Sequence, residues 1–161
     1  MIAPAGTSAS GFFLFTCVVA RKMLCCWQLR SNRPSMKSRR LLLVEDDEFL
    51  ARLLKEKLEQ ERCQVTLAVD GQRALDALKT APLPEVVILD LILPVVDGFE
   101  VLQNIRSNDD PAVKALPVIV LSNLGSAPDI QRVRDLGANE YLVKAQMTPG
   151  EIVDHVLRFT K

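Results

Sequence analysis

The chain has 161 residues, enough for one ordinary domain with a full core and too few for two typical ones. Its net charge of zero hides an asymmetry, because residues 1–40 contain seven basic residues and no acidic one. Residues 41–161 therefore hold 13 basic against 20 acidic residues. Their net charge of −7 argues against direct binding of nucleic acid, which requires a positive surface.

The first 35 residues are not expected to belong to a folded domain. Their apolar run, residues 11–20, is about half of the roughly 20 residues that a membrane-spanning helix needs. The basic pair Arg21-Lys22 follows this run, whereas a secretory signal carries its basic residues first. Residues 1–35 are predicted to be an upstream extension of the reading frame or a disordered tail. Weak membrane association is a further alternative, but no stable membrane insertion is expected.

Cysteine usage separates the same two regions. Cys17, Cys25 and Cys26 lie in the first segment, and only Cys63 lies in the remainder. No pair has zinc-finger spacing, and the adjacent Cys25-Cys26 is not a C-x-x-C redox motif. The domain, predicted to span residues 39–161, is therefore expected to be reduced and cytoplasmic.

Short apolar runs recur along this domain and predict five β-strands. Nearly continuous apolar runs of this length are typical of strands in a sheet covered on both faces. The runs cover residues 41–44, 65–68, 86–89, 118–121 and 141–143.

Amphipathic segments between these runs predict helices, and most begin at a capping residue. Asp47 suits the first helix N-terminus, and Asp70 can cap the second, although Arg73 cannot close a capping box there. The remaining starts have capping-box spacing: Asp97-x-x-Glu100, Ser126-x-x-Asp129 and Thr148-x-x-Glu151. Strict strand–helix alternation predicts an α/β domain with a parallel sheet and helices on both faces. In such a sheet, the site lies beyond the carboxyl ends of the strands.

Reactive side chains stand where these strands end. Glu45 and Asp46 follow the first strand, Asp90 the third and Lys144 the fifth, and Ser122 ends the fourth. Converging carboxylates repel one another unless a cation lies among them, and oxygen ligands without His or Cys favour Mg²⁺. A lysine and a hydroxyl can bind phosphoryl oxygens, and a carboxylate whose charge is neutralised can attack phosphorus. The strand ends therefore predict phosphoryl transfer.

Five motifs in this order resemble the response-regulator receiver family over about residues 39–160. They are the segments 42–47 (LLVEDD), 87–94 (VILDLILP), 97–98 (DG), 117–122 (PVIVLS) and 137–144 (GANEYLVK). The resemblance implies a flavodoxin-like (βα)5 fold, a doubly wound five-stranded parallel sheet with the strand order 2-1-3-4-5.

The resemblance also implies a role for each residue of the site. Asp90 would be the phosphoacceptor and Lys144 would hold a phosphoryl oxygen. Mg²⁺ would be bound directly by Asp46 and by Asp90, through water by Glu45, and by the backbone carbonyl of Ile92. Two further residues would form the switch: the hydroxyl of Ser122 moves toward the phosphoryl group, and the rotamer of Tyr141 follows it.

The function implied is that of a stand-alone, cytoplasmic receiver in a two-component phosphorelay. It would accept the phosphoryl group from a sensor histidine kinase or a phosphotransfer protein. It would catalyse only its own phosphorylation and dephosphorylation, so it is not classed as an enzyme. Its downstream protein target would bind the face made by the fourth helix (126–136), the fifth strand and the fifth helix.

Other interpretations of these residues stay open. Glu45 and Asp46 could be helix-terminal carboxylates, Asp90 a cap, and Lys144 a surface residue. The family usually has Lys-Pro with a cis bond where this chain has Lys144-Ala145, and a cis bond before Ala would cost about 2.5–4 kcal/mol. The bond is therefore expected to be trans and Lys144 less firmly placed. This departure keeps a phosphorylation-independent pseudo-receiver as the alternative function. A dehalogenase-like phosphohydrolase lacks support, because residues 41–161 contain no Asp-x-Asp.

Overall fold

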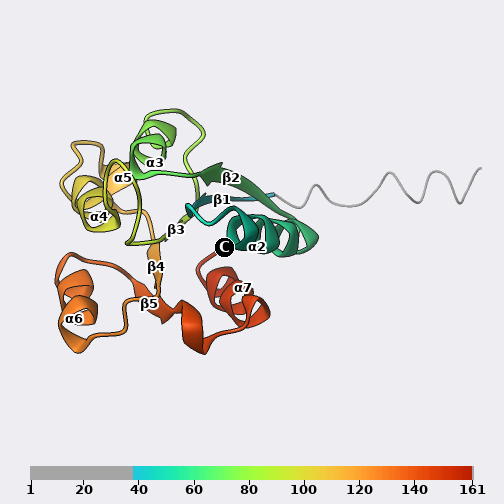
Figure 1. Cartoon of the computed structure of the whole chain (residues 1–161). Coiled ribbons are helices and arrows are strands. Elements are labelled where there is room, and N and C mark those ends of the chain that lie inside the picture. The colour runs from blue at the N-terminus through green and yellow to red at the C-terminus, as the bar shows by residue number, and fades with distance from the viewer. Residues whose placement is uncertain (1–37, 161) are drawn as a thin grey trace, which may run out of the picture. The chain divides into compact units, whose positions relative to one another are not determined.

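The structure is a computed structural model, and it describes residues 38–160. The N-terminal extension proposed for residues 1–35 lies outside this range. A five-stranded parallel sheet with the strand order β2-β1-β3-β4-β5 forms the centre of the domain (Figure 1). Its strands are β1 (Arg39–Val44), β2 (Cys63–Ala68), β3 (Val86–Leu89), β4 (Val118–Ser122) and β5 (Glu140–Val143). The predicted flavodoxin-like fold and strand order are thereby confirmed.

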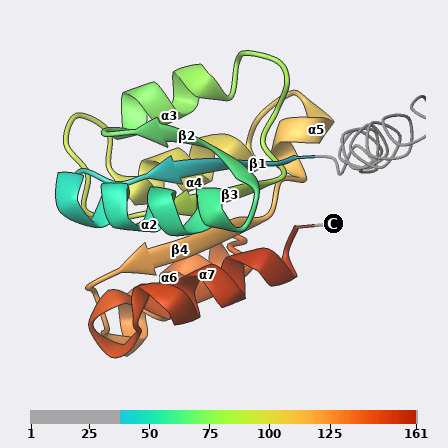
Figure 2. The same ribbon diagram turned by 90° about the vertical axis from the view of Figure 1, so that its right-hand side faces the viewer.

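Helices cover both faces of the sheet. On one face lie α2 (Glu48–Gln60) and α7 (Pro149–Arg158); on the other lie α3 (Gly71–Ala77), α4 (Gly98–Arg106), α5 (Pro111–Lys114) and α6 (Ala127–Asp135) (Figures 1 and 2). A 3-10 turn, η1 (Lys144–Gln146), follows β5.

Side chains of alternating direction on β1 show how the sheet separates two cores. Leu42 and Val44 belong to the core under α3–α6, and Leu41 and Leu43 to the core under α2 and α7. All four are at most 1 % exposed, as expected for a strand between two helical layers.

Capping chemistry fixes the helix starts as the sequence predicts. The side chain of Asp97 accepts a hydrogen bond from the backbone N–H of Glu100, and Thr148 and Glu151 form a reciprocal capping box. Asp70 also caps its helix, because this bond requires only the backbone N–H of Arg73. These caps matter for the site, since α2, α4, α6 and α7 all begin at the edge where the strands end.

Candidate functional site

The carboxyl ends of the strands bring the predicted residues of the site together. Val44 and Leu89 are register partners in β1 and β3, so Glu45 and Asp90, the next residue of each chain segment, lie beside one another. Each is tied to the neighbouring strand end by a backbone bond of 3.0 Å: the N–H of Glu45 donates to Ala68 O, and that of Asp90 to Val44 O. Both residues are at most 5 % exposed.

Lys144 links these two carboxylates. Its Nζ lies 2.6 Å from Asp90 Oδ2 and 2.7 Å from the Glu45 carboxylate, although 54 and 99 residues separate the partners along the chain. Burial alone would lower the pKa of Lys144, but the hydrogen bonds to Asp90 and Glu45 outweigh it and raise that pKa. Lys144 is therefore a fixed ammonium at neutral pH. The looser placement of Lys144 expected from the missing proline stays a prediction.

The peptide bond after Lys144 is trans, as predicted. Between residues 38 and 160, the bond Ala81–Pro82 is the one cis peptide. The chain after β5 continues into the η1 turn, and Met147 N donates back to Lys144 O at 3.4 Å. In this chain a 3-10 turn follows Lys144 at the position where the family usually has a cis-proline.

Three carboxylates form a cluster of oxygen ligands at this edge. One oxygen each from Glu45, Asp46 and Asp90 lies within 4.8 Å of the others, with Asp46 exposed and its two neighbours buried. Burial raises the pKa of Glu45, and Lys144 opposes that shift without cancelling it. Lys144 Nζ lies 2.7 Å from both Oε1 and Oε2 of Glu45, so the buried carboxylate faces one ammonium with both of its oxygens. A donor set of carboxylate oxygens alone, with Asp46 open to solvent, fits a hard divalent cation such as Mg²⁺.

The loop after β3 is packed closely around Asp90. Ile92 N donates to Asp90 Oδ1 at 3.2 Å, so the loop that carries the predicted carbonyl ligand folds back on Asp90. Gly98 lies so close that a Cβ there would be 2.1 Å from Asp90 O, and its own N–H donates to Leu91 O at 2.9 Å. The Asp-Gly motif therefore has a steric reason, because α4 begins directly against the backbone of Asp90.

Ser122 and Tyr141 both hold the loop that follows β4. Ser122 is fully buried, and its Oγ accepts a hydrogen bond from Leu124 N at 3.4 Å. The hydroxyl of Tyr141 donates to Leu124 O, and burial raises the pKa of this tyrosine. The two predicted switch residues are thus joined through one loop residue.

Two features of the domain have no signal in the sequence. Val95, in the loop between Asp90 and α4, has a φ of 70° and is 83 % exposed, although β-branched residues rarely adopt this left-handed backbone. Arg106, at the end of α4, donates to Gly137 O at 2.9 Å and to Asn139 Oδ1 at 3.1 Å. It therefore connects α4 with the turn between α6 and β5.

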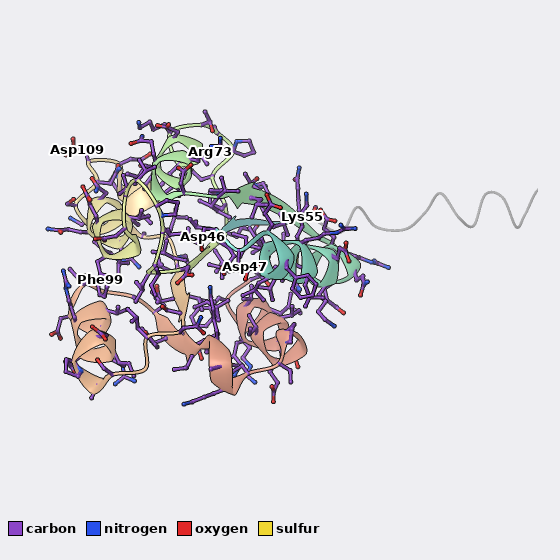
Figure 3. All side chains as sticks on the ribbon, in the orientation of Figure 1. Asp46, Asp47, Lys55, Arg73, Phe99 and Asp109 are labelled. Atoms are coloured by element: carbon purple, nitrogen blue, oxygen red, sulfur yellow. The ribbon has the colours of Figure 1, made fainter. Side chains whose placement is uncertain are left out.

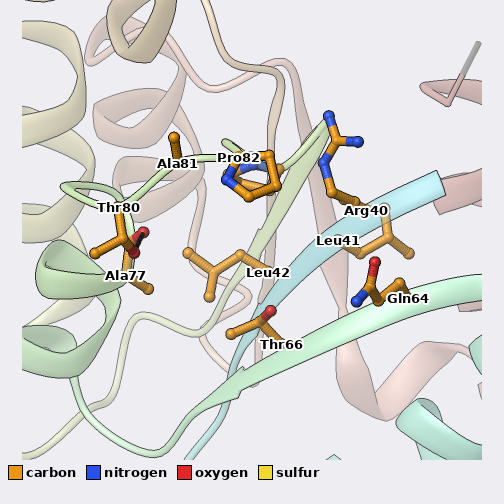
Figure 4. A pocket seen from close by; sticks show the side chains of 10 residues that line it. Arg40, Leu41, Leu42, Gln64, Thr66, Ala77, Thr80, Ala81 and Pro82 are labelled. Atoms are coloured by element: carbon orange, nitrogen blue, oxygen red, sulfur yellow. Dashed lines mark hydrogen bonds between the residues drawn. The ribbon is translucent and has the colours of Figure 1, made fainter. Parts of the chain in front are cut away.

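A cavity of about 210 Å³ lies at the opposite, amino-terminal end of the strands (Figure 4). β1 contributes Arg40 and Leu42 to its lining, and β2 contributes Gln64 and Thr66. Arg40 is the one charged residue among its lining side chains, so the cavity offers no convergent set of reactive groups.

Similar proteins agree with this fold. The family described as the response regulator receiver domain matches residues 41–157. The response regulator PleD of Caulobacter vibrioides is 34 % identical over 124 residues, which cover 77 % of this chain and 25 % of PleD. The phosphorylated cyanobacterial phytochrome response regulator RcpA is 34 % identical with a TM-score of 0.66, over 75 % of this chain and 92 % of that one. The Mn²⁺-bound response regulator Rcp1 is 30 % identical, also with a TM-score of 0.66, over 75 % and 93 %.

The chain belongs to the response-regulator receiver family. Receiver domains are generally non-enzymatic signalling modules that bind Mg²⁺ through acidic residues and interact with histidine kinases or phosphotransfer proteins. This chain spans between about a quarter and just under half of the length of the curated relatives it matches. None of the helices between residues 38 and 160 is long and apolar enough to cross a membrane.

Proposed function

We propose that Asp90 accepts a phosphoryl group from a phosphohistidine of a sensor histidine kinase or phosphotransfer protein. The observation that carries this proposal is the bridge from Lys144 Nζ to both Asp90 and Glu45 inside a cluster of carboxylates. One Oδ atom of Asp90 would form the new bond to phosphorus as the bond from phosphorus to the histidine nitrogen breaks. The electron pair of the broken bond would stay on the imidazole.

Mg²⁺ is the proposed cofactor. Asp46 and Asp90 would bind it directly, Glu45 through water, and Ile92 through its backbone carbonyl. The ion would neutralise charge on the phosphoryl oxygens. The cluster of oxygen ligands from Glu45, Asp46 and Asp90 supports this assignment.

Lys144 and Ser122 would bind the transferred group. As the charge of the Asp90 carboxylate is lost in the acyl phosphate, the ammonium of Lys144 would turn to a phosphoryl oxygen. The hydroxyl of Ser122 would leave Leu124 N and donate to a second oxygen. Tyr141 would then lose the loop conformation that holds its hydroxyl on Leu124 O.

The output would be a change of protein contacts at the surface of α6, β5 and α7. Ser122 and Tyr141 support this choice, because both hold the loop that leads into α6. We propose residues 39–161 as a cytoplasmic receiver domain, with residues 1–35 outside its fold. The negative charge of residues 41–161 supports action without direct nucleic-acid binding.

A phosphorylation-independent pseudo-receiver is the second candidate, favoured only by Ala145 in the place of the usual proline. Intact-protein mass spectrometry after incubation with Mg²⁺ and acetyl phosphate separates the two. Receiver chemistry predicts a single phosphoryl adduct on the wild type, absent from Asp90→Ala and from a sample treated with chelator. If the wild type stays unmodified while a known receiver is labelled, the pseudo-receiver is the better description.

A further inference from the structure

The loop that follows Asp90, residues 91–97, contains a strained turn. Val96 N donates to Pro94 O at 2.8 Å, and Val95 between them has a φ of 70°. A hydrogen bond across one residue of positive φ defines a γ-turn of the strained and rare kind. Such strain persists only where the surrounding structure holds the backbone in place. The loop is therefore held by contacts with elements outside it.

Helix α3 makes such a contact at its first residue, Gly71. This residue stands two positions before Arg73, which is labelled on α3 in Figure 3. A Cβ on Gly71 would lie 2.1 Å from Val96 O and 2.8 Å from Val101 Cγ2. Val96 O is a backbone atom, and Val101 is a fully buried, β-branched residue of α4, so neither can turn aside. Only glycine lets the backbones of α3 and of the loop approach this closely.

Of the two segments in contact, the start of α3 is held more firmly than the loop. Asp70 caps α3 by accepting a hydrogen bond from Arg73 N at 2.7 Å, and Ala74 in the first turn is fully buried. Ile92 and Val95 in the loop are exposed, so their side chains give the loop little packing. A side chain added at the first position of α3 would therefore displace the loop rather than the helix.

Displacement of this loop would reach the site, because the loop begins next to Asp90. Ile92 N donates to Asp90 Oδ1 at 3.2 Å, and Gly98 N, just after the loop, donates to Leu91 O at 2.9 Å. The carbonyl proposed as a metal ligand belongs to Ile92, within the same loop. A binding site needs its ligands within about 0.5 Å of the productive geometry, so a small shift of the loop is enough to weaken binding.

We propose that Gly71 is a positioning residue for the site. By admitting Val96 O against the backbone of α3, it holds the loop where Asp90 and the carbonyl of Ile92 can bind Mg²⁺ together. This inference rests on the proposed function, since it requires the metal site at Asp90. Gly71 is itself no ligand of that site, and it acts only through the loop.

Titration with Mg²⁺ followed by NMR tests the positioning role, and the spectra also show whether each variant is folded. Substitutions of residues that support a metal ligand typically weaken metal binding about 10- to 100-fold, so Gly71→Ala should bind Mg²⁺ at least about tenfold more weakly than the wild type. Gly150→Ala is the matched control. Gly150 also lies in the first turn of a helix, and a Cβ there would meet Thr148 Oγ1 at the ordinary contact distance of 4.0 Å. Its Mg²⁺ affinity should equal that of the wild type.

A double variant separates the loop from the core, and it replaces Gly71→Ala if that variant does not fold. Gly71→Ala/Val101→Ala removes the overlap with Val101 Cγ2 but keeps the overlap with Val96 O. A role of Gly71 in core packing alone predicts the same Mg²⁺ affinity for this double variant and for Val101→Ala. The positioning role predicts that the double variant binds Mg²⁺ at least about tenfold more weakly than Val101→Ala.

The outcomes of these titrations distinguish the positioning role from the proposed function. Equal Mg²⁺ affinity of Gly71→Ala and the wild type, or of the double variant and Val101→Ala, would overturn the positioning role and leave the proposed function intact. An equal loss in Gly150→Ala would also overturn it, because that substitution meets no atom of the loop. If the wild type binds no Mg²⁺, the proposed function fails, and the positioning role fails with it.

Discussion

The two ends of the sheet differ in what they gather. At the amino ends, β1 and β2 line a cavity of about 210 Å³ whose one charged side chain, Arg40, lies 4.0 Å from Glu85. At the carboxyl ends, two buried carboxylates share one lysine within 2.7 Å, and a third carboxylate stands beside them. The difference shows that a cavity alone does not identify a functional site. Charges that are costly to bury, and are buried together, identify it better.

Replacing a cation at each end of the sheet should give the largest difference in the free energy of unfolding, and Lys144→Gln is the substitution at the carboxyl end. It leaves Glu45 and Asp90 facing one another without a cation, and breaking a buried pair costs about 3 kcal/mol or more of the free energy of unfolding. Arg40→Gln, at the amino end, should cost only about 1 kcal/mol, because this pair is longer and more exposed. Urea denaturation in the presence of chelator measures both. Equal losses would remove the distinction between the ends.

Magnesium should stabilise the domain through residues at the carboxyl ends of the strands and not through residues at the amino ends. At a hundredfold excess over its dissociation constant, the ion should add about 2.7 kcal/mol to the free energy of unfolding of the wild type. Asp46→Asn should lose most of this gain, because it removes a ligand charge from the cluster. Gln64→Ala, in the wall of the cavity, should keep it. The same denaturation assay with and without Mg²⁺ reports the gain, and a gain in Asp46→Asn that matches the wild type would argue against this metal site.

A strained residue stands at each end of the sheet and allows a third comparison. Val95, beside the site, has a φ of 70°, and Arg62, before β2, has a φ of 63°. Val95→Gly should raise the free energy of unfolding by about 1 kcal/mol, since glycine adopts this conformation without the strain of a β-branched side chain. Arg62→Gly should gain less, because arginine is not β-branched. If the gains are reversed, strain is not concentrated beside Asp90.

A substitution at the start of α7, also at the carboxyl end, should have the smallest effect on stability. Hydrogen bonds from Thr148 N and Oγ lower the pKa of Glu151, so its ionised form stabilises the folded state. This stabilisation is present above the ordinary glutamate pKa and is lost as the pH falls through the lowered value. Glu151→Gln should therefore have a slightly lower melting temperature than the wild type at neutral pH. The two melting temperatures should converge in acid, and a constant difference at every pH would exclude the carboxylate as its cause.

Much of this structure follows from local patterns in the sequence. All five strands were predicted within two residues at each end, and Glu45, Asp90, Ser122 and Lys144 were expected at one edge because parallel strands share their direction. Helix α5 was missed, although Asp110-Pro111 is a capping residue followed by proline at the first helical position.

Other features cannot be read from the sequence. A positive φ at Val95 contradicts the preference of its side chain and is imposed by the surrounding loop. Arg106 donates to the carbonyl of Gly137, and the guanidinium of Arg132 lies over the ring of Phe99, so each contact joins residues about 30 positions apart. Neither arginine lies in a motif. Long side chains on exposed helix faces can reach several neighbours, so only the packing of α4 and α6 decides which ones they contact.

Locating the modified residue tests the central claim most directly. The acetyl phosphate product would be reduced with borohydride, which converts an aspartyl phosphate to homoserine, then digested and sequenced by tandem mass spectrometry. The account predicts homoserine at position 90 and nowhere else, and its loss when Mg²⁺ is chelated. Homoserine at position 46 or 47, or modification of Asp90 that is unaffected by chelation, would contradict the site as described.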